Sequence, residues 1–445
     1  MPRWVRQVAI GWVIAAPVCL AAGGPAAAQG QESSWVGTSG CSKQGCHNGP
    51  GKGKRAEYRL WSTQDPHSQA FDVLKEKISQ RIAEGIGLTQ PAYKADLCVR
   101  CHSADAVPWS PKPNQADRAR ESRLSEGVSC EVCHGAASKW LEPHLRPQWR
   151  AQTRAVKAQS GLRDLTSPRA RVEICINCHV GMPGFEVNHD MIAAGHPRLR
   201  FEVTAFLDTG LTRHWDETEM RRRDPAFTAK LWFMGQTATF KRDVAVLAAR
   251  TPEQLFTEFA DHDCYACHKS LARRSFTKPL EETSLTWGRW PAELTLLAQK
   301  RTLGLPQGTV ADVAQIRDRL QLTTFDHSAL DFHALTEKFA AWDKFADQAQ
   351  WPAADLRAMM LDCASPVAAG NSEWEVAWQR YRAISALGQS LNGGREVQGT
   401  KLGPPLADLR AILKFRDGFA SPVGFELETF NRQMEVVRKT LEAQP

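Results

Sequence analysis

The sequence lacks a long apolar run, a persistent strand pattern and any nucleic-acid-binding motif. Its longest apolar stretch, from about residue 8 to 22, is shorter than a typical membrane-spanning helix of roughly 20 residues. No alternation of apolar and polar residues is sustained, which argues against a sheet-rich fold. The net charge of +7 comes without a nucleic-acid motif, so it does not indicate a nucleic-acid partner.

Cysteine and histidine, in contrast, recur in a fixed pattern through the first 268 residues. Four copies of Cys-x-x-Cys-His and one of Cys-x-x-x-x-Cys-His are present, formed by Cys41, Cys46 and His47; Cys98, Cys101 and His102; Cys130, Cys133 and His134; Cys175, Cys178 and His179; and Cys264, Cys267 and His268. Each copy is typical of a c-type haem attachment site. The two thiols bind the vinyl groups of one haem, and the histidine ligates its iron from the proximal side. The sequence therefore predicts five covalently attached haem c groups.

Zinc or a redox dithiol is the main alternative for a Cys-x-x-Cys pair. Zinc binding does not require a histidine directly after the second cysteine, yet all five motifs have one. The first motif has two extra residues between its cysteines, which leaves a disulfide with an unrelated histidine as an open alternative. Of the 12 cysteines, ten lie in the motifs and Cys19 lies in the leader. Cys363 is left over, and we expect it to be a buried thiol.

The N-terminus has the pattern of a Sec-type secretory signal peptide over residues 1–28. Arg3 and Arg6 precede the apolar stretch, and a small-residue cleavage site follows at 26–28. We expect a periplasmic mature chain without a transmembrane segment; an uncleaved anchor is the alternative. Five haems, each adding about −1 charge, bring the holoprotein close to neutral. Basic side chains are therefore expected to pair with haem propionates rather than with nucleic acid.

The mature chain divides near residue 280. All haem motifs lie within 35–280, and helical periodicity dominates 285–445. Two apolar helix faces are predicted, one from Trp374, Trp378, Tyr381, Ile384, Leu387 and Leu391 and one from Leu427, Phe430, Met434, Val437 and Leu441; a third stripe runs from Val310 to Leu320. Asp224–Pro225 and Thr251–Pro252 are predicted to begin two further helices. We predict a mainly α protein: a multihaem cytochrome c fold with little regular sheet, followed by a C-terminal α-helical region.

Eight histidines remain as candidates for the distal side of the five irons. Local sequence context favours five of them: His67, His144, His189, His196 and His214. His262 lies too close to Cys264 to cross its own haem, and His327 and His333 are expected to be structural. Met182 and Met191 are weaker candidates because methionine more often serves in packing. Bis-His ligation of every haem is therefore feasible.

The chain resembles the multihaem cytochromes of the cytochrome c-554 (c-552/4) family over roughly residues 35–300. The segments that carry the resemblance are GCSKQGCHNG, DPHSQAF, GVSCEVCHGAASKWLEPH, CINCHVGMPGFEVNHDMIAAGHPRLRFE, DCYACHKSL and WGRW at 287–290. The resemblance implies distal roles for His67, His144, His189 and His196. It also implies closely packed haems, in parallel-stacked and near-perpendicular pairs. The chain departs from the named cytochrome in having five motifs instead of four and a long C-terminal helical part.

Two functions fit this pattern. The favoured one is a periplasmic electron carrier or electron-transfer subunit with redox protein partners, a membrane quinol oxidase among the candidates. The alternative is a multihaem reductase or oxidase of small nitrogen or sulfur compounds, which needs one open haem iron. Only four tyrosines are present and all five motifs end in histidine, so no catalytic set can be assigned. If His214 is not a ligand, one iron is open and the alternative strengthens. For the C-terminal helices, packing onto the haem region is favoured over docking to a partner.

Overall fold

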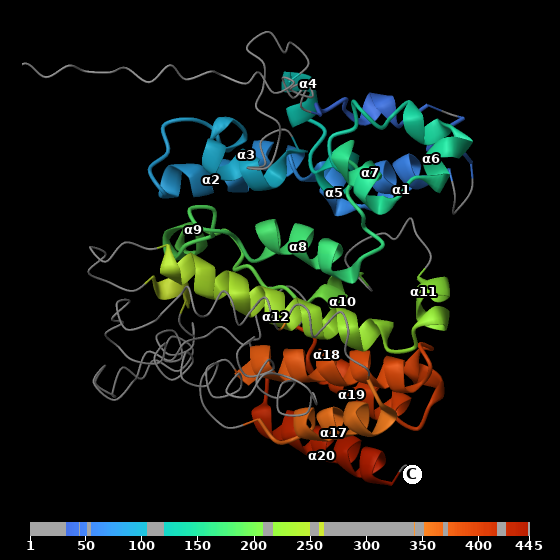
Figure 1. Ribbon diagram of the computed structural model, residues 1–445. Helices are drawn as coiled ribbons and strands as arrows, with labels where there is room; N and C mark the ends of the chain where they lie inside the picture. The colour runs from blue at the N-terminus through green and yellow to red at the C-terminus, as the bar shows by residue number, and fades with distance from the viewer. Residues whose placement is uncertain are drawn as a thin grey trace, which may run out of the picture. The chain divides into compact units, whose positions relative to one another are not determined.

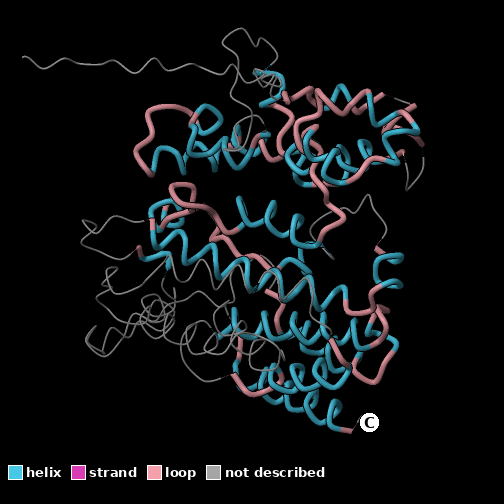
Figure 2. Tube along the Cα trace, in the orientation of Figure 1, coloured by secondary structure: helices cyan, strands magenta, loops and turns pink. Residues whose placement is uncertain are grey.

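The fold is built from helices and loops. The computed structural model describes residues 33–43, 45–50, 55–104, 120–207, 217–249, 258–261, 342, 351–367, 373–415 and 424–443. No strand occurs in these ranges (Figure 2), and the prediction of a mainly α protein is confirmed. Residues 33–445 belong to one compact unit.

The first part of this unit consists of short helices. The α-helices up to residue 205 are α1 (Glu57–Gln64), α2 (Lys77–Gly85), α3 (Asp96–His102), α4 (Arg120–Leu124), α5 (Cys130–His134), α6 (Pro147–Ala151), α7 (Arg154–Gln159), α8 (Pro168–His179), α9 (His189–Ala193) and α10 (Val203–Ala205). Single 3-10 turns lie among them: η1 (Thr38–Gly40), η2 (Pro66–Gln69), η3 (Asp72–Lys75), η4 (Ala92–Lys94) and η6 (Pro143–Leu145). Proline at the first position starts α6, α8, η2 and η6, where its missing N–H costs no hydrogen bond.

Longer helices follow. They include α12 (Phe227–Ala248), α17 (Ala353–Cys363), α18 (Glu373–Leu391), α19 (Gly403–Ile412) and α20 (Leu427–Glu442). The shorter α11 (Thr218–Arg223) precedes α12, and the 3-10 turns η8 (Phe259–Asp261) and η11 (Val397–Gly399) lie between the longer helices. Helix α12 packs against both α8 and α18, and α17 packs against α18 (Figure 1).

A single large apolar cluster joins these helices. It contains Ile176 of α8, Trp232 of α12 and Leu387 of α18, all fully buried. The motif that ends α8 is thus anchored in the same core as the C-terminal helices. Upstream, the apolar clusters are small; one consists of Phe71, Leu74, Ala83, Ala92 and Val99, and another of Trp35, Ala104 and Val132.

The helical stripes predicted from the sequence are confirmed where the structure describes them. The predicted faces of α18 and α20 are directed into the large cluster, and Cys363 is a buried thiol on α17. At the start of α12, the Asp224 side chain accepts a hydrogen bond from the N–H of Ala226, as a capping residue does. The stripe at 310–320 and the helix predicted from Thr251 lie outside the described residues.

A buried ion pair connects α18 to the segment that enters α10. Arg382 lies 3.1 Å from one carboxylate oxygen of Glu202. The Glu202 carboxylate also accepts hydrogen bonds from the N–H groups of Thr204 and Ala205. Both charged side chains are nearly inaccessible to solvent. Because paired charges are costly to separate in the interior, this contact fixes the chain beside Phe206. The Phe206 ring in turn lies 4.8 Å from the His179 ring.

Candidate haem-binding site

Three of the motifs occupy the C-terminal ends of helices. Helix α3 ends at His102, α5 at His134 and α8 at His179. Residues three and four positions apart share one face of a helix. The spacing Cys-x-x-Cys-His therefore directs both thiols and the imidazole of each motif to the same side.

The first motif is built differently. Cys41 follows the 3-10 turn η1, and residues 45–47 form a turn, so the two extra residues take the motif out of a helix. A residue of the third motif binds the segment that precedes the first motif. The buried Glu131 carboxylate accepts hydrogen bonds from the N–H groups of Val36 at 3.1 Å and Gly37 at 2.8 Å. Burial raises the pKa of Glu131, and these hydrogen bonds oppose the rise.

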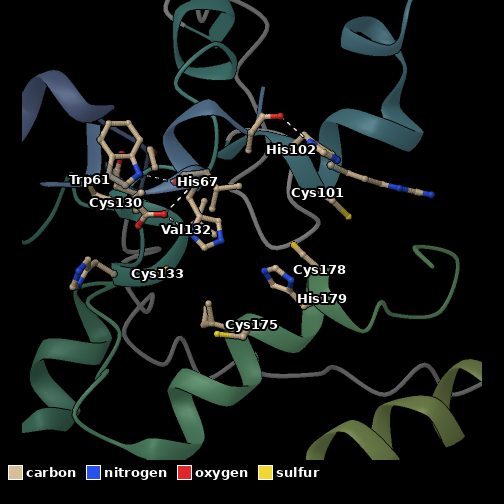
Figure 3. Close-up of a pocket in the computed structure, with 18 of the residues that line it drawn as sticks. Trp61, His67, Cys101, His102, Cys130, Val132, Cys133, Cys175, Cys178 and His179 are labelled. Carbon is tan, nitrogen blue, oxygen red and sulfur yellow. Dashed lines mark hydrogen bonds and ion pairs between the residues drawn. The ribbon is translucent and has the colours of Figure 1, made fainter. Parts of the chain in front are cut away.

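A cavity of about 1250 Å³ lies among the first four motifs. Ordinary small-molecule pockets are smaller, about 300–1000 Å³. Its lining includes both cysteines and the histidine of every one of these motifs: Cys41, Cys46, His47, Cys98, Cys101, His102, Cys130, Cys133, His134, Cys175, Cys178 and His179. Figure 3 shows residues from α3, α5 and α8 converging on it. The structure therefore brings together motifs that are up to 138 residues apart, from Cys41 to His179.

Thiols of different motifs meet in this cavity. The side chain of Cys41 interacts with that of Cys130, and the side chain of Cys101 with that of Cys178. Figure 3 shows the sulfurs of Cys101 and Cys178 directed toward each other. The first motif thus adjoins the third, and the second adjoins the fourth. Burial raises the pKa of Cys133 to about 11, which keeps this thiol neutral at pH 7. Cys133 is therefore unlike the exposed thiolates of redox-sensing sites.

Two proximal histidines face distal candidates across the cavity. The rings of His47 and His144 are nearly parallel, with a 13° interplanar angle and centroids 6.3 Å apart. The rings of His67 and His179 are nearly perpendicular, at 80°, with centroids 6.0 Å apart. An imidazole nitrogen lies about 2.0 Å from a bound metal and the ring centre roughly 1 Å beyond it, so two axial imidazoles have centroids about 6 Å apart. Both pairs meet this spacing.

A third proximal histidine has a candidate beside it. Burial lowers the pKa of His102, and the nearby His196 lowers it further. Burial likewise lowers the pKa of His179 to about 4, with smaller effects from His67 and His102. Both buried imidazoles are consequently neutral at pH 7, the form in which a histidine ligates a metal.

For five of these histidines, namely His47, His67, His102, His144 and His196, the Nδ1 atom has a hydrogen-bond partner outside the ring pairs. His47 pairs with a carboxylate oxygen of Glu57 and His67 with one of Asp65, each at 3.0 Å. The remaining three use backbone carbonyl groups: His102 that of Ala70, His196 that of Pro197 and His144 that of Leu141. Nδ1 donation fixes the tautomer and leaves Nε2 as the metal-ligating atom.

The remaining ligand candidates are not paired with a motif histidine in the described residues. His189 begins α9, and its ring lies 5.6 Å from that of Phe259, whose segment also supplies Glu258 as acceptor for the His189 N–H. Met191 is buried and lines the cavity, as does Tyr58. The fifth motif, formed by Cys264, Cys267 and His268, lies outside the described residues, as do His214, His262, His327 and His333.

Sequence reasoning missed the residues that hydrogen-bond to the candidate ligands. Asp65 could have been recognised, because an Asp-Pro pair two residues before His67 is typical of a capped turn, and its side chain does accept a hydrogen bond from the His67 N–H. Glu57 and Glu131 carry no such local signal, since their partners come from other parts of the chain.

The donor set fits haem c. Each of the first four motifs offers two thiols and an imidazole on the cavity wall, and the imidazoles of His144 and His67 lie opposite two of them. Cationic side chains suited to propionates, including Arg100, Lys157 and Arg163, line the same space.

Comparison with known proteins agrees with this chemistry. Residues 41–135 match the family model described as cytochrome c554 and c-prime, which covers the first three motifs. No curated protein and no solved structure matches the chain. The family match implies covalently bound haem c, and hence iron, and it supports a role in electron transfer. Residues 41–135 therefore belong to the cytochrome c554 and c-prime family of c-type cytochromes.

Proposed function

We propose that this protein is a periplasmic pentahaem cytochrome that passes electrons through closely packed, bis-His-ligated haems. The observation that carries the proposal is the pairing of histidine rings across one cavity, above all His47 with His144 and His67 with His179. In each pair, one member follows a thiol pair and the other comes from a distant segment. Two axial imidazoles fill both sides of an iron and leave it no substrate position.

The two ring pairs, together with the nearness of His196 to His102, suggest how the ligands are shared. His144 serves the first motif, His196 the second and His67 the fourth, as distal partners of His47, His102 and His179 respectively. For the fifth motif, we assign His189, because its neighbour Phe259 lies five residues before Cys264. His214 is then left for His134 of the third motif.

Close packing of the motifs supports electron transfer between them. The contacts of Cys41 with Cys130 and of Cys101 with Cys178 bring the attachment points of the first and third haems together, and those of the second and fourth. The protein holds the attachment points rigidly, since α8 is anchored in the large core and Glu131 ties the first motif to the third. Rigid, closely spaced centres suit electron transfer without any substrate-binding step.

The proposed location rests on the leader sequence. Residues 1–28 have the pattern of a Sec-type signal peptide, and export places the apo-chain where haem c is attached. Among the helices that the structure describes, none combines the length and the apolar composition needed to cross a membrane. The partners proposed are other exported redox proteins, or the periplasmic face of a membrane quinol oxidase.

Carbon monoxide distinguishes the proposed carrier from a multihaem enzyme. A ferrous haem with two histidine ligands has no vacant position, so we expect the absorption spectrum of the dithionite-reduced protein to be unchanged by carbon monoxide. Binding of one equivalent, together with turnover of nitrite, hydroxylamine or sulfite by reduced dye, would instead indicate an open iron and the reductase or oxidase alternative.

A further inference from the structure

The acceptors of the histidine Nδ1 atoms fall into two chemical classes. His47 and His67 each point Nδ1 at a carboxylate, while His102, His144 and His196 point theirs at peptide carbonyl groups. By the ligand pairs given above, the first and fourth haems each have one carboxylate-supported histidine. Among the Nδ1 contacts seen in the described residues, the pair His102 and His196 has only carbonyl acceptors.

Asp65 is held in place to act on His67. One of its oxygens accepts hydrogen bonds from both the backbone N–H and the Nδ1 of His67, at 3.0 Å each. Its side chain is only 4 % exposed, and it caps the turn η2. The carboxylate can therefore neither rotate away nor be well screened by water.

Glu57 acts on His47 from the first turn of α1. One carboxylate oxygen lies 3.0 Å from the Nδ1 of His47, and the other accepts the N–H of Arg55. This side chain is 25 % exposed, so water weakens its influence relative to that of Asp65.

The acceptor on Nδ1 changes how strongly Nε2 donates to iron. A hydrogen bond to a carboxylate is stronger than one to a neutral carbonyl and makes the imidazole more basic. A more basic ligand, and the negative charge itself, stabilise ferric over ferrous iron and so lower the reduction potential. The effect is larger where the carboxylate is buried.

We infer that Asp65 and Glu57 are potential-setting residues that divide the haems of this cytochrome into two classes. The haem ligated by His67 and His179 has its potential lowered most, and the haem of His47 and His144 is lowered to a smaller extent. The haem ligated by His102 and His196 receives no such lowering, so an electron within this group rests preferentially on it. This inference depends on the ligand pairs of the proposed function.

The test is a redox titration of the holoprotein followed by EPR, with Asp65→Asn and Glu57→Gln compared with wild type. Each variant keeps the shape of the side chain and removes its charge. We expect the midpoint potential of one haem to rise in each variant. For Asp65→Asn the expected rise is about 59 mV, which for one electron is a tenfold shift of the equilibrium from ferric toward ferrous iron. A smaller rise is expected for Glu57→Gln. The other haems should be nearly unchanged.

Asp72→Asn is the matched control. Its carboxylate is 63 % exposed in η3 and pairs with Lys75. Its midpoints should equal those of wild type. Unchanged midpoints in both Asp65→Asn and Glu57→Gln, with haem content and low-spin spectra intact, would overturn the inference and leave the proposed ligation standing. A high-spin signal already present in the wild-type protein would refute the ligation itself. If Asp65→Asn does not mature, the more exposed Glu57→Gln decides the question.

Discussion

Replacing His144 by alanine is expected to convert one haem from low-spin to high-spin. The His144 ring faces that of His47 at 6.3 Å and 13°, in the arrangement of two axial ligands. Removing it leaves His47 as the sole protein ligand of that iron, and a five-coordinate or water-bound ferric haem is high-spin. Low-temperature EPR of the oxidised variant should show one equivalent of high-spin iron. The reduced variant should also bind one equivalent of carbon monoxide.

Arg146→Ala is the control for this experiment, because Arg146 is an exposed residue that directly follows η6, the turn that carries His144. Its spectra should match those of wild type. If His144→Ala also remains entirely low-spin with an unchanged haem count, then His144 is not a ligand and the first motif has another partner.

The double variant Cys41→Ser, Cys46→Ser is expected to lose one covalent haem. The first motif has four residues between its cysteines, yet both thiols line the cavity with His47, and no disulfide joins the two. Without the thiols, no thioether bonds can form to that haem. Intact mass and acid-acetone-resistant haem should both fall by one haem per chain.

Cys363→Ser provides the matched control, since Cys363 is a buried thiol on α17 outside every motif. Its haem count should equal that of wild type. An unchanged haem count in the double variant would show that the first motif is not an attachment site, and it would favour the disulfide considered from the sequence.

Several helices of the fold could be predicted from local patterns in the sequence. The apolar face of α20 is read from residues three and four apart, and burial of Phe430, Met434 and Val437 confirms it. The capped start of α12 at Asp224 follows equally from neighbouring residues. Such features depend on residues that are close together in the sequence, so they can be predicted without knowledge of the tertiary structure.

The pairing of histidine rings depends on tertiary structure and was not predicted. His144 follows the third motif by ten residues, yet its ring faces His47 of the first. His67 follows the first motif but faces His179 of the fourth. Loops that cross between motifs decide these pairs, and no local periodicity encodes where a loop crosses. The supporting role of Glu57 was missed for a similar reason, since its partner lies ten residues away across a turn.

The relation between the haem region and the C-terminal helices also required the structure. The sequence places a boundary near residue 280, where the motifs end. In the described residues, however, α8 with its motif shares one apolar cluster with α12, α17, α18 and α20. Apolar stripes show that a helix has a buried face, but they do not show which helix covers that face.

The most direct test of bis-His haem ligation is low-temperature EPR of the oxidised wild-type protein, with haem counted by pyridine haemochrome. Five haems are expected, all of them low-spin. The nearly parallel rings of His47 and His144 should give a rhombic signal, and the nearly perpendicular rings of His67 and His179 a highly anisotropic one. A stoichiometric high-spin ferric signal would contradict full bis-His ligation and indicate an open iron, as an enzyme requires.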